Sequence, residues 1–152
     1  MCSKEGSTDS TIRQRIEAAV TARDLPALIR EIPYANFLGI TCYSLGEEYV
    51  YKLPKNESNL GNPTLPALHG GVIGGFMETA GALHTMIYAD SLRVPKVVDF
   101  SLDYLSPGRH CDTFAKCSFV RQGRKVVNIA ISAWQTQESK PIAKARAQFL
   151  MV

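Results

Sequence analysis

The stretch that decides the fold is Leu68-His69-Gly70-Gly71-Val72-Ile73-Gly74-Gly75-Phe76-Met77-Glu78-Thr79-Ala80-Gly81-Ala82-Leu83-His84-Thr85-Met86-Ile87. This run is mostly apolar, yet it contains five glycines and only one formally charged residue, Glu78. Glycine inside a helix costs about 1 kcal/mol relative to alanine, so this many glycines require a structural reason.

Helical periodicity over residues 72–89 divides the run into two faces. One face is bulky and apolar, as a core face should be, and it carries Val72, Ile73, Phe76, Ala80, Leu83, His84 and Ile87. The other face carries small residues and one acid: Gly71, Gly74, Gly75, Glu78, Gly81, Ala82, Thr85 and Ala89. Bare backbone allows another chain or a ligand to approach closely, and a lone carboxylate in such surroundings is a candidate for chemistry.

The rest of the chain predicts an antiparallel sheet around this helix. An amphipathic helix is expected from Thr11, with a second helical turn capped by Asp24 and a packed connector over residues 32–38. Strands are expected at residues 39–44, 48–53, 97–105, 113–121, 125–136 and 142–151, with a loop at 54–68. Because successive hairpins make an antiparallel sheet, the order predicts an α+β fold in which one long helix lies across the sheet. The glycine face of that helix is then left free to meet something else.

Composition limits the classes of function. The chain has 152 residues and a net charge of +3, which is a mild bias and gives no argument for nucleic acid. The four cysteines show neither a C-x-x-C pair nor a disulfide framework, so we expect reduced thiols in the cytoplasm. No run approaches about 18 uninterrupted apolar residues and the N-terminal residues lack a signal core, so we expect neither a membrane span nor secretion. Three isolated histidines, without metal-ligand spacing, predict no metal site.

His69-Gly70-Gly71, followed by an apolar helix with an acid nine positions after the histidine, resembles the hot-dog-fold acyl-CoA thioesterases. The closest type is the phenylacetate-pathway and 4-hydroxybenzoyl-CoA group. The resemblance runs from residues 32–39 through the strand at 98–107 and the hairpin at 121–124 to the end of the last strand. It implies a hot-dog thioesterase domain at residues 32–152, in which an antiparallel sheet wraps around the central helix. Residues 1–31 are expected to form an N-terminal helical extension.

The resemblance also implies roles for individual residues. Gly70, at the helix N-terminus, would donate its N–H to the thioester carbonyl, where the orphan amides and the helix dipole favour developing negative charge. Glu78 would either attack the thioester or activate a water. In the family this acid reaches across a dimer interface, opposite the Gly70 of the partner chain. His69 is a further candidate catalytic residue, although a role in which its ring only orients the turn at Gly70 and Gly71 through a hydrogen bond is favoured. Gly71 is expected to belong to the substrate site.

Asn62 is the candidate for positioning water or substrate. Relatives often carry an asparagine six residues before the histidine, but that position here is Pro63, and Asn62 stands one place earlier. Asn62 can therefore position water or substrate only if the loop at residues 54–68 bulges.

Four cations, Arg109, Arg121, Arg124 and Lys125, are candidates for binding the phosphates of coenzyme A. The alternative is that they form a solvated hairpin tip.

The leading hypothesis is an acyl-CoA thioesterase that is active as a homodimer, with a dimer of dimers as the expected larger assembly. It would use no cofactor beyond the coenzyme A of its substrate. The alternatives are a non-catalytic acyl-CoA-binding or regulatory protein of this fold and, with less support, an enoyl-CoA hydratase or dehydratase. The acyl group, and the choice between coenzyme A and an acyl-carrier protein as donor, stay open.

Overall fold

A computed structural model describes residues 6–151 of the chain. The helices are α1 (Gly6–Thr21), α2 (Leu25–Glu31), α3 (Pro33–Leu38) and α4 (Gly70–Tyr88), with the 3-10 turn η1 (Glu57–Asn59). The strands are β1 (Thr41–Leu45), β2 (Glu48–Leu53), β3 (Leu60–Asn62), β4 (Ala67–Leu68), β5 (Lys96–Tyr104), β6 (Thr113–Gln122), β7 (Val126–Trp134) and β8 (Ala143–Leu150). The order of one central helix between two and four long strands is as predicted.

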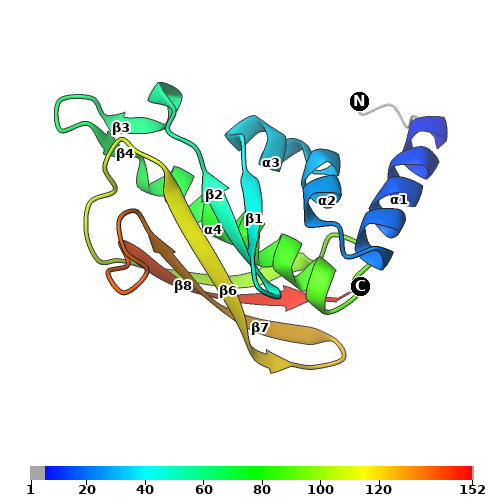
Figure 1. Ribbon diagram of the computed structural model, residues 1–152. Helices are drawn as coiled ribbons and strands as arrows, with labels where there is room; N and C mark the ends of the chain where they lie inside the picture. The colour runs from blue at the N-terminus through cyan, green and yellow to red at the C-terminus, as the bar shows by residue number, and fades with distance from the viewer. Residues whose placement is uncertain (1–5, 152) are drawn as a thin grey trace.

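Six strands form one antiparallel sheet in the order β1-β2-β6-β7-β8-β5, and the long helix α4 lies across it (Figure 1). Strand β8 shows why the helix packs there, since Ala143, Ala145, Ala147 and Phe149 are buried while the residues between them are exposed. The bulky face of α4 supplies Ile73, Phe76, Leu83 and Ile87 to the same core. The expected α+β fold, with a sheet wrapped around one long helix, is confirmed.

The N-terminal helices differ in detail from the prediction. Asp24 caps α2 as expected, because its Oδ1 accepts the N–H of Ala27 at 2.9 Å. Residues 32–38, expected as a packed connector, contain the short helix α3, which buries Ala35 and Leu38 and ends at Gly39 in a left-handed conformation with φ of 70°. Leu25 and Leu28 of α2 belong to the same buried cluster as α4. The division between residues 31 and 32 stays a prediction.

The glycine face of α4 is not uniformly free, which corrects the prediction. Gly81 is buried against the sheet, and a Cβ there would lie 3.0 Å from Ile131 Cδ1 and 3.1 Å from Phe149 Cε2. Toward the N-terminal half, a Cβ on Gly74 would meet Leu102 of β5 at 3.3 Å, and one on Gly75 would meet the Tyr34 hydroxyl of α3 at 2.5 Å. Side chains of the same chain therefore use much of the space that the glycines leave.

Candidate active site

The first turn of α4 is held by His69, its N-cap residue. The His69 Nδ1 accepts the N–H of Gly71 at 2.9 Å, and the His69 N–H donates to the carbonyl oxygen of Asn59 at 2.9 Å. Because Nδ1 is the acceptor, the neutral ring carries its proton on Nε2. His69 is exposed beside the helix N-terminus. The bond from the Gly71 N–H is the contact through which His69 would orient the turn, and the role itself stays a prediction.

Gly70 is the first residue of α4, and its N–H has no acceptor among residues 6–151. A hollow of about 400 Å³ opens beside it, lined by Gly70, Tyr104 and the loop at 105–108 among others. An orphan amide at the positive end of a 19-residue helix is suited to hold a negatively charged oxygen. The Gly70 amide is thus free of an acceptor among the described residues, and a hollow lies beside this end of the helix.

Tyr104 of β5 fixes the peptide that follows Gly70. Its hydroxyl donates to the Gly70 carbonyl oxygen at 2.7 Å, and a Cβ on Gly70 would lie 2.9 Å from that hydroxyl. Alternation over residues 97–105 predicts that Tyr104 lies on the buried face of its strand and so does not mark it as a site residue, whereas the side chain is 56% exposed. The only sequence signal was its place at the end of a strand in the family-like segment.

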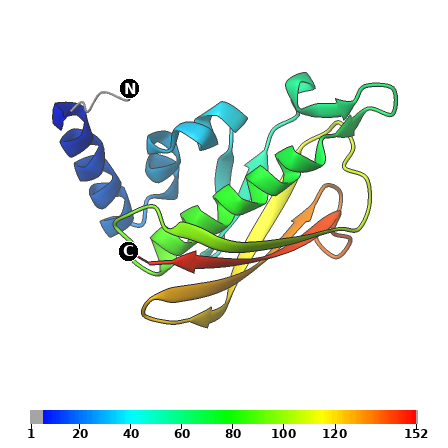
Figure 2. The same ribbon diagram turned by 180° about the vertical axis from the view of Figure 1, so that it is seen from behind.

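Glu78 projects from the middle of α4. It is half-buried, and its carboxylate makes no hydrogen bond or ion pair within the described range 6–151. Each residue of a helix is rotated by about 100° about the helix axis. Viewed along this axis, Glu78 therefore points between Gly74 and Gly75, about 40° from the direction of Gly74 and about 60° from that of Gly75. Tyr34 of α3 covers Gly75 and Leu102 of β5 covers Gly74, and Figure 2 shows α4 running between these two elements. Glu78 therefore lies on α4 between Tyr34 on one side and Leu102 on the other, and we call the strip of helix between these two side chains the α4 trough.

One chain does not bring Gly70 and Glu78 to the same atom. Eight residues separate them, which corresponds to about 12 Å along a helix axis. A thioester carbonyl bound at the Gly70 amide is thus out of reach of the Glu78 of the same helix.

Asn62 ends β3 and lies in the small β3–β4 sheet beside the helix N-terminus. Its Oδ1 accepts from the backbone N–H and the hydroxyl of Thr64, at 3.1 and 2.7 Å, and from Leu65 N at 3.2 Å. The side-chain oxygen is therefore engaged in its own loop, and the Nδ2 group is the part of Asn62 that is left to position a substrate or water.

The four predicted cations lie at opposite ends of α4. Arg109 pairs with Ala67 in an isolated bridge, close to the helix N-terminus. Arg121, Arg124 and Lys125 lie at the β6–β7 hairpin, where a hollow joins Gly123 and Arg124 to Ala89, just after the helix C-terminus. All four side chains are exposed. A single chain therefore does not gather them into one phosphate site.

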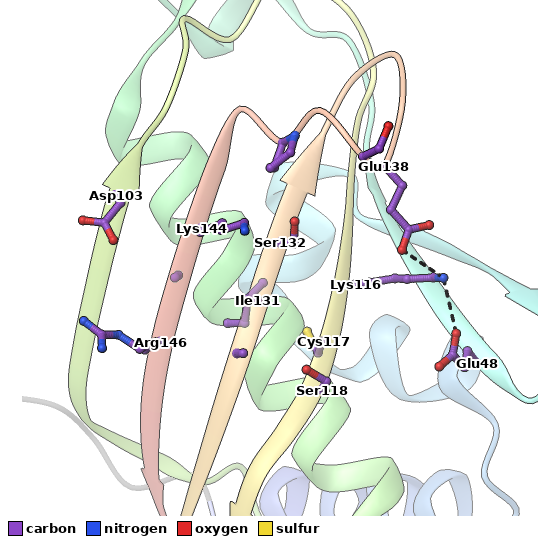
Figure 3. A pocket seen from close by; sticks show the side chains of 14 residues that line it. Glu48, Asp103, Lys116, Cys117, Ser118, Ile131, Ser132, Glu138, Lys144 and Arg146 are labelled. Atoms are coloured by element: carbon purple, nitrogen blue, oxygen red, sulfur yellow. Dashed lines mark ion pairs between the residues drawn. The ribbon is translucent and has the colours of Figure 1, made fainter.

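A second hollow, of about 680 Å³, lies on the outer face of the sheet (Figure 3). Its floor is formed by small residues of β6 and β7, and Lys116 closes one side through ion pairs to Glu48 at 3.3 Å and Glu138 at 3.2 Å. Figure 3 shows α4 behind the sheet from this side. The sheet thus separates this hollow from Glu78.

The described residues contain neither a metal-binding cluster nor a membrane-spanning helix. Within residues 6–151, no three His, Cys, Asp or Glu side chains are grouped so that they would hold a metal ion. Among the helices of the described part of the chain, none is both long and apolar enough to cross a membrane.

Comparisons with known proteins identify similar chains. A sequence model of the thioesterase superfamily matches residues 65–142. The medium/long-chain acyl-CoA thioesterase YigI of Escherichia coli K12 is 29% identical over 155 residues, which cover 90% of this chain and 99% of YigI. A solved structure of a Chromobacterium violaceum protein is 41% identical, with a TM-score of 0.74 over 91% of this chain and 97% of that one. The PaaI protein of the E. coli phenylacetic acid degradation operon is 20% identical, with a TM-score of 0.68 over 93% of this chain and 98% of PaaI, and shows a likeness of fold.

Proposed function

Because the chain belongs to the thioesterase superfamily and is a thioester hydrolase, we propose that it converts acyl-CoA to a carboxylic acid and free CoA at sites shared between two copies of the chain. It has the hot-dog fold. The observation that carries the proposal is the unpaired carboxylate of Glu78 in the α4 trough, together with the free Gly70 amide at the start of the same helix. The name of the YigI relative supports acyl-CoA as the substrate.

In the proposed reaction, the Gly70 N–H binds the thioester oxygen and stabilises the negative charge that forms there. Glu78 either takes a proton from the water that attacks the carbonyl carbon, or attacks that carbon itself. Collapse of the tetrahedral intermediate expels the CoA thiolate, which is then protonated. On the direct-attack route this leaves a mixed anhydride between the acyl group and Glu78, which water hydrolyses to the carboxylic acid and free Glu78. Rapid acid quenching followed by peptide mass spectrometry separates the two roles, because only direct attack leaves an acyl group on Glu78.

The separation of about 12 Å between Gly70 and Glu78 along one helix supports a shared site. Strand β5 is an edge of the sheet and pairs only with β8 among the described strands, so its outer side is open to a second copy. Pairing of two β5 edges about a two-fold axis makes the two α4 helices antiparallel. The Gly70 of one chain then comes opposite the Glu78 of the other.

The same dimer would bring the four predicted cations together. In an antiparallel pair, the C-terminal end of one α4 lies alongside the N-terminal end of the other. The hairpin cations Arg121, Arg124 and Lys125 of one chain are then at the same end of the dimer as Arg109 of its partner. We propose that the CoA phosphates bind at this end of the dimer. We also expect two such dimers to form the larger assembly.

We also propose that the reaction needs no cofactor beyond the CoA of its substrate and that it takes place in the cytoplasm. The support for this location is chemical. Cys42, Cys111 and Cys117 are all free thiols, as expected in a reducing compartment.

The test is hydrolysis of a panel of aryl- and fatty-acyl-CoAs by the wild type, Glu78→Gln and a control. Glu47→Gln is the control, because it neutralises an exposed carboxylate in the β1–β2 turn. We expect Glu78→Gln to lose about 100-fold or more in kcat, as is typical when a positioned base is removed, and Glu47→Gln to match the wild type. Full activity in Glu78→Gln would refute the role of this acid. Saturable binding of acyl-CoA with no turnover of any thioester would instead identify a binding protein.

A further inference from the structure

Two aromatic side chains of α3 are exposed near the α4 trough: Tyr34 borders the trough, and Phe37 stacks on Tyr34. Tyr34 and Phe37 of α3 stack with ring centroids 6.1 Å apart and planes inclined by 21°. Phe37 is 80% exposed and Tyr34 is 46% exposed. Large apolar side chains on a surface are common singly, but a stacked pair beside a candidate catalytic acid is a feature that requires an explanation.

The position of the pair is set by Gly75. The absence of a side chain there leaves room for Tyr34. The Tyr34 hydroxyl oxygen would lie 2.5 Å from a Cβ on Gly75, and the ring atoms Cε1 and Cζ would each lie 3.3 Å from it. Gly75 precedes Glu78 by three residues, so the two lie one above the other on the same helix face. The Tyr34 ring is therefore packed onto the helix one turn from the Glu78 carboxylate.

We propose that Tyr34 and Phe37 bind the acyl group of the substrate and set which chain lengths are hydrolysed. The inference rests on the proposed function and extends it to the substrate's apolar part. A thioester carbon that reaches Glu78 must carry its acyl substituent along one wall of the trough. The β5 wall is the edge assigned to the partner chain, which leaves the aromatic wall for the acyl group.

The chemistry of the two ends of the substrate supports this assignment. Coenzyme A is anionic and suits cationic side chains, whereas stacked aromatic rings offer apolar surface to a hydrocarbon chain or an aryl ring. Each methylene buried against such a surface contributes up to about a fourfold gain in kcat/KM. The pair should therefore make kcat/KM rise with acyl length.

The experiment measures kcat/KM for saturated acyl-CoAs from butanoyl to tetradecanoyl in the wild type, Tyr34→Ala, Phe37→Ala and Tyr43→Ala. Tyr43 is a matched control, because it is 45% exposed and lies against Phe114 with ring centroids 6.3 Å apart, on β1. Dissociation constants of S-alkyl-CoA thioethers of the same lengths keep the test independent of turnover. Sedimentation velocity records the oligomeric state of every variant.

We expect Tyr34→Ala and Phe37→Ala to flatten the dependence on chain length, with a loss of about tenfold or more for the longest substrate and about twofold or less for butanoyl-CoA. The thioether affinities should follow the same pattern, and Tyr43→Ala should run parallel to the wild type. Profiles parallel to the wild type in both α3 variants would overturn the inference. An equal loss of kcat/KM at all acyl lengths, together with dissociation of the dimer, would also overturn it. Weaker inhibition of the α3 variants by free CoA, with an unchanged dependence on acyl length, would overturn it as well. A wild type that binds the thioethers in this pattern but hydrolyses no acyl-CoA would refute the proposed function alone.

Discussion

Tyr104 donates its hydroxyl proton to the carbonyl oxygen of Gly70 at 2.7 Å, and this bond ties the edge strand β5 to the first turn of α4. The same peptide group carries the Gly71 N–H, which donates to His69 Nδ1. One peptide plane is thus held from both sides, by a phenol on its oxygen and by an imidazole on its nitrogen. Because Gly70 is the proposed oxyanion donor, the precision of its N–H depends on this pair of bonds.

Tyr104→Phe should lower activity more than stability. The variant loses one exposed hydrogen bond, which contributes about 0.5–1.5 kcal/mol to folding at most, while the turn that carries Gly70 gains freedom. We expect kcat to fall by about three- to tenfold with a smaller change in KM, because the bond acts through the oxyanion donor. Steady-state kinetics and a thermal melt check this. A change in KM alone would show that Tyr104 only contacts substrate.

Two glycines of α4 should respond oppositely to alanine. In Gly75→Ala the new Cβ meets the far end of the half-exposed Tyr34, which can swing away, so the gain of about 1 kcal/mol in helix propensity is retained. In Gly81→Ala the Cβ presses on Ile131 and Phe149, which are buried, and overpacking costs about 1–3 kcal/mol. Urea unfolding of both variants measures the difference. Equal effects would mean that the two faces of the helix are packed alike.

His84 should make folding stability depend on pH. It is buried against Tyr88 and Phe119, with ring centroids 4.5 and 5.0 Å away, and its Nδ1 has no partner among the described residues. Burial lowers the pKa of His84 from 6.5 to about 4, against a weaker opposing effect of Glu48. His84 therefore binds a proton below about pH 6.5 in the unfolded chain, but only below about pH 4 in the folded chain.

Stability should accordingly fall as the pH drops from 6.5 to 4, by roughly 3 kcal/mol, and this contribution should be constant above that window. His84→Phe places an apolar ring among the aromatic rings and should flatten the dependence. Urea unfolding at several pH values in both proteins is the measurement. Identical slopes would show that another group causes the acid sensitivity.

Local pattern predicted the sheet well and its edges poorly. Alternation of alanines and Phe149 with polar residues over residues 142–151 predicts one buried face, and β8 has one because it lies between β7 and β5 regardless of any partner. Alternation over residues 97–105 likewise predicts that Val98 is buried, whereas Val98 is 56% exposed at a register shift on the sheet edge. Burial of an edge depends on what covers it, and a single sequence does not contain that neighbour.

In the candidate site, too, the features set by local sequence were predictable and those set by tertiary packing were not. The spacing of His69, Gly70 and Glu78 indicated the candidate residues, because each depends on one helix and its cap. Tyr34 could not be predicted, since its position follows from the packing of α3 on Gly75. Periodicity also grouped Gly75 with Gly81 on one face, but only the tertiary packing shows that one lies under Tyr34 and the other under the sheet.

The β5 edge offers a test of dimerisation. Val98→Lys places a charge at the open edge, where two copies related by a two-fold axis would bring the ammonium groups close together. We expect dissociation in sedimentation velocity and a parallel loss of specific activity. Val120→Lys is the control, because Val120 is 67% exposed at a comparable register shift but lies on the interior strand β6. A stable dimer in Val98→Lys would place the interface elsewhere.

The proposed role of the Gly70 N–H can be isolated by two substitutions at one position. Gly70→Pro removes the N–H at the first helical position, where proline fits the helix. Gly70→Ala adds a Cβ that meets the Tyr104 hydroxyl at 2.9 Å but keeps the N–H. The ratio of their kcat values therefore reports the amide rather than the crowding, and we expect proline to be about 100-fold slower. Equal rates would exclude the Gly70 N–H as the oxyanion donor.

The same variant decides whether the site is shared. Each dimer has two sites, and each site joins the Glu78 of one chain to the Gly70 of the other. Mixing inactive Gly70→Pro with inactive Glu78→Gln, with exchange of subunits, makes half of the dimers mixed, and each mixed dimer regains one intact site. Activity should therefore rise to about a quarter of the wild-type value. If Gly70 and Glu78 act within one chain, every site in the mixture lacks one group and the activity stays at the level of the separate variants.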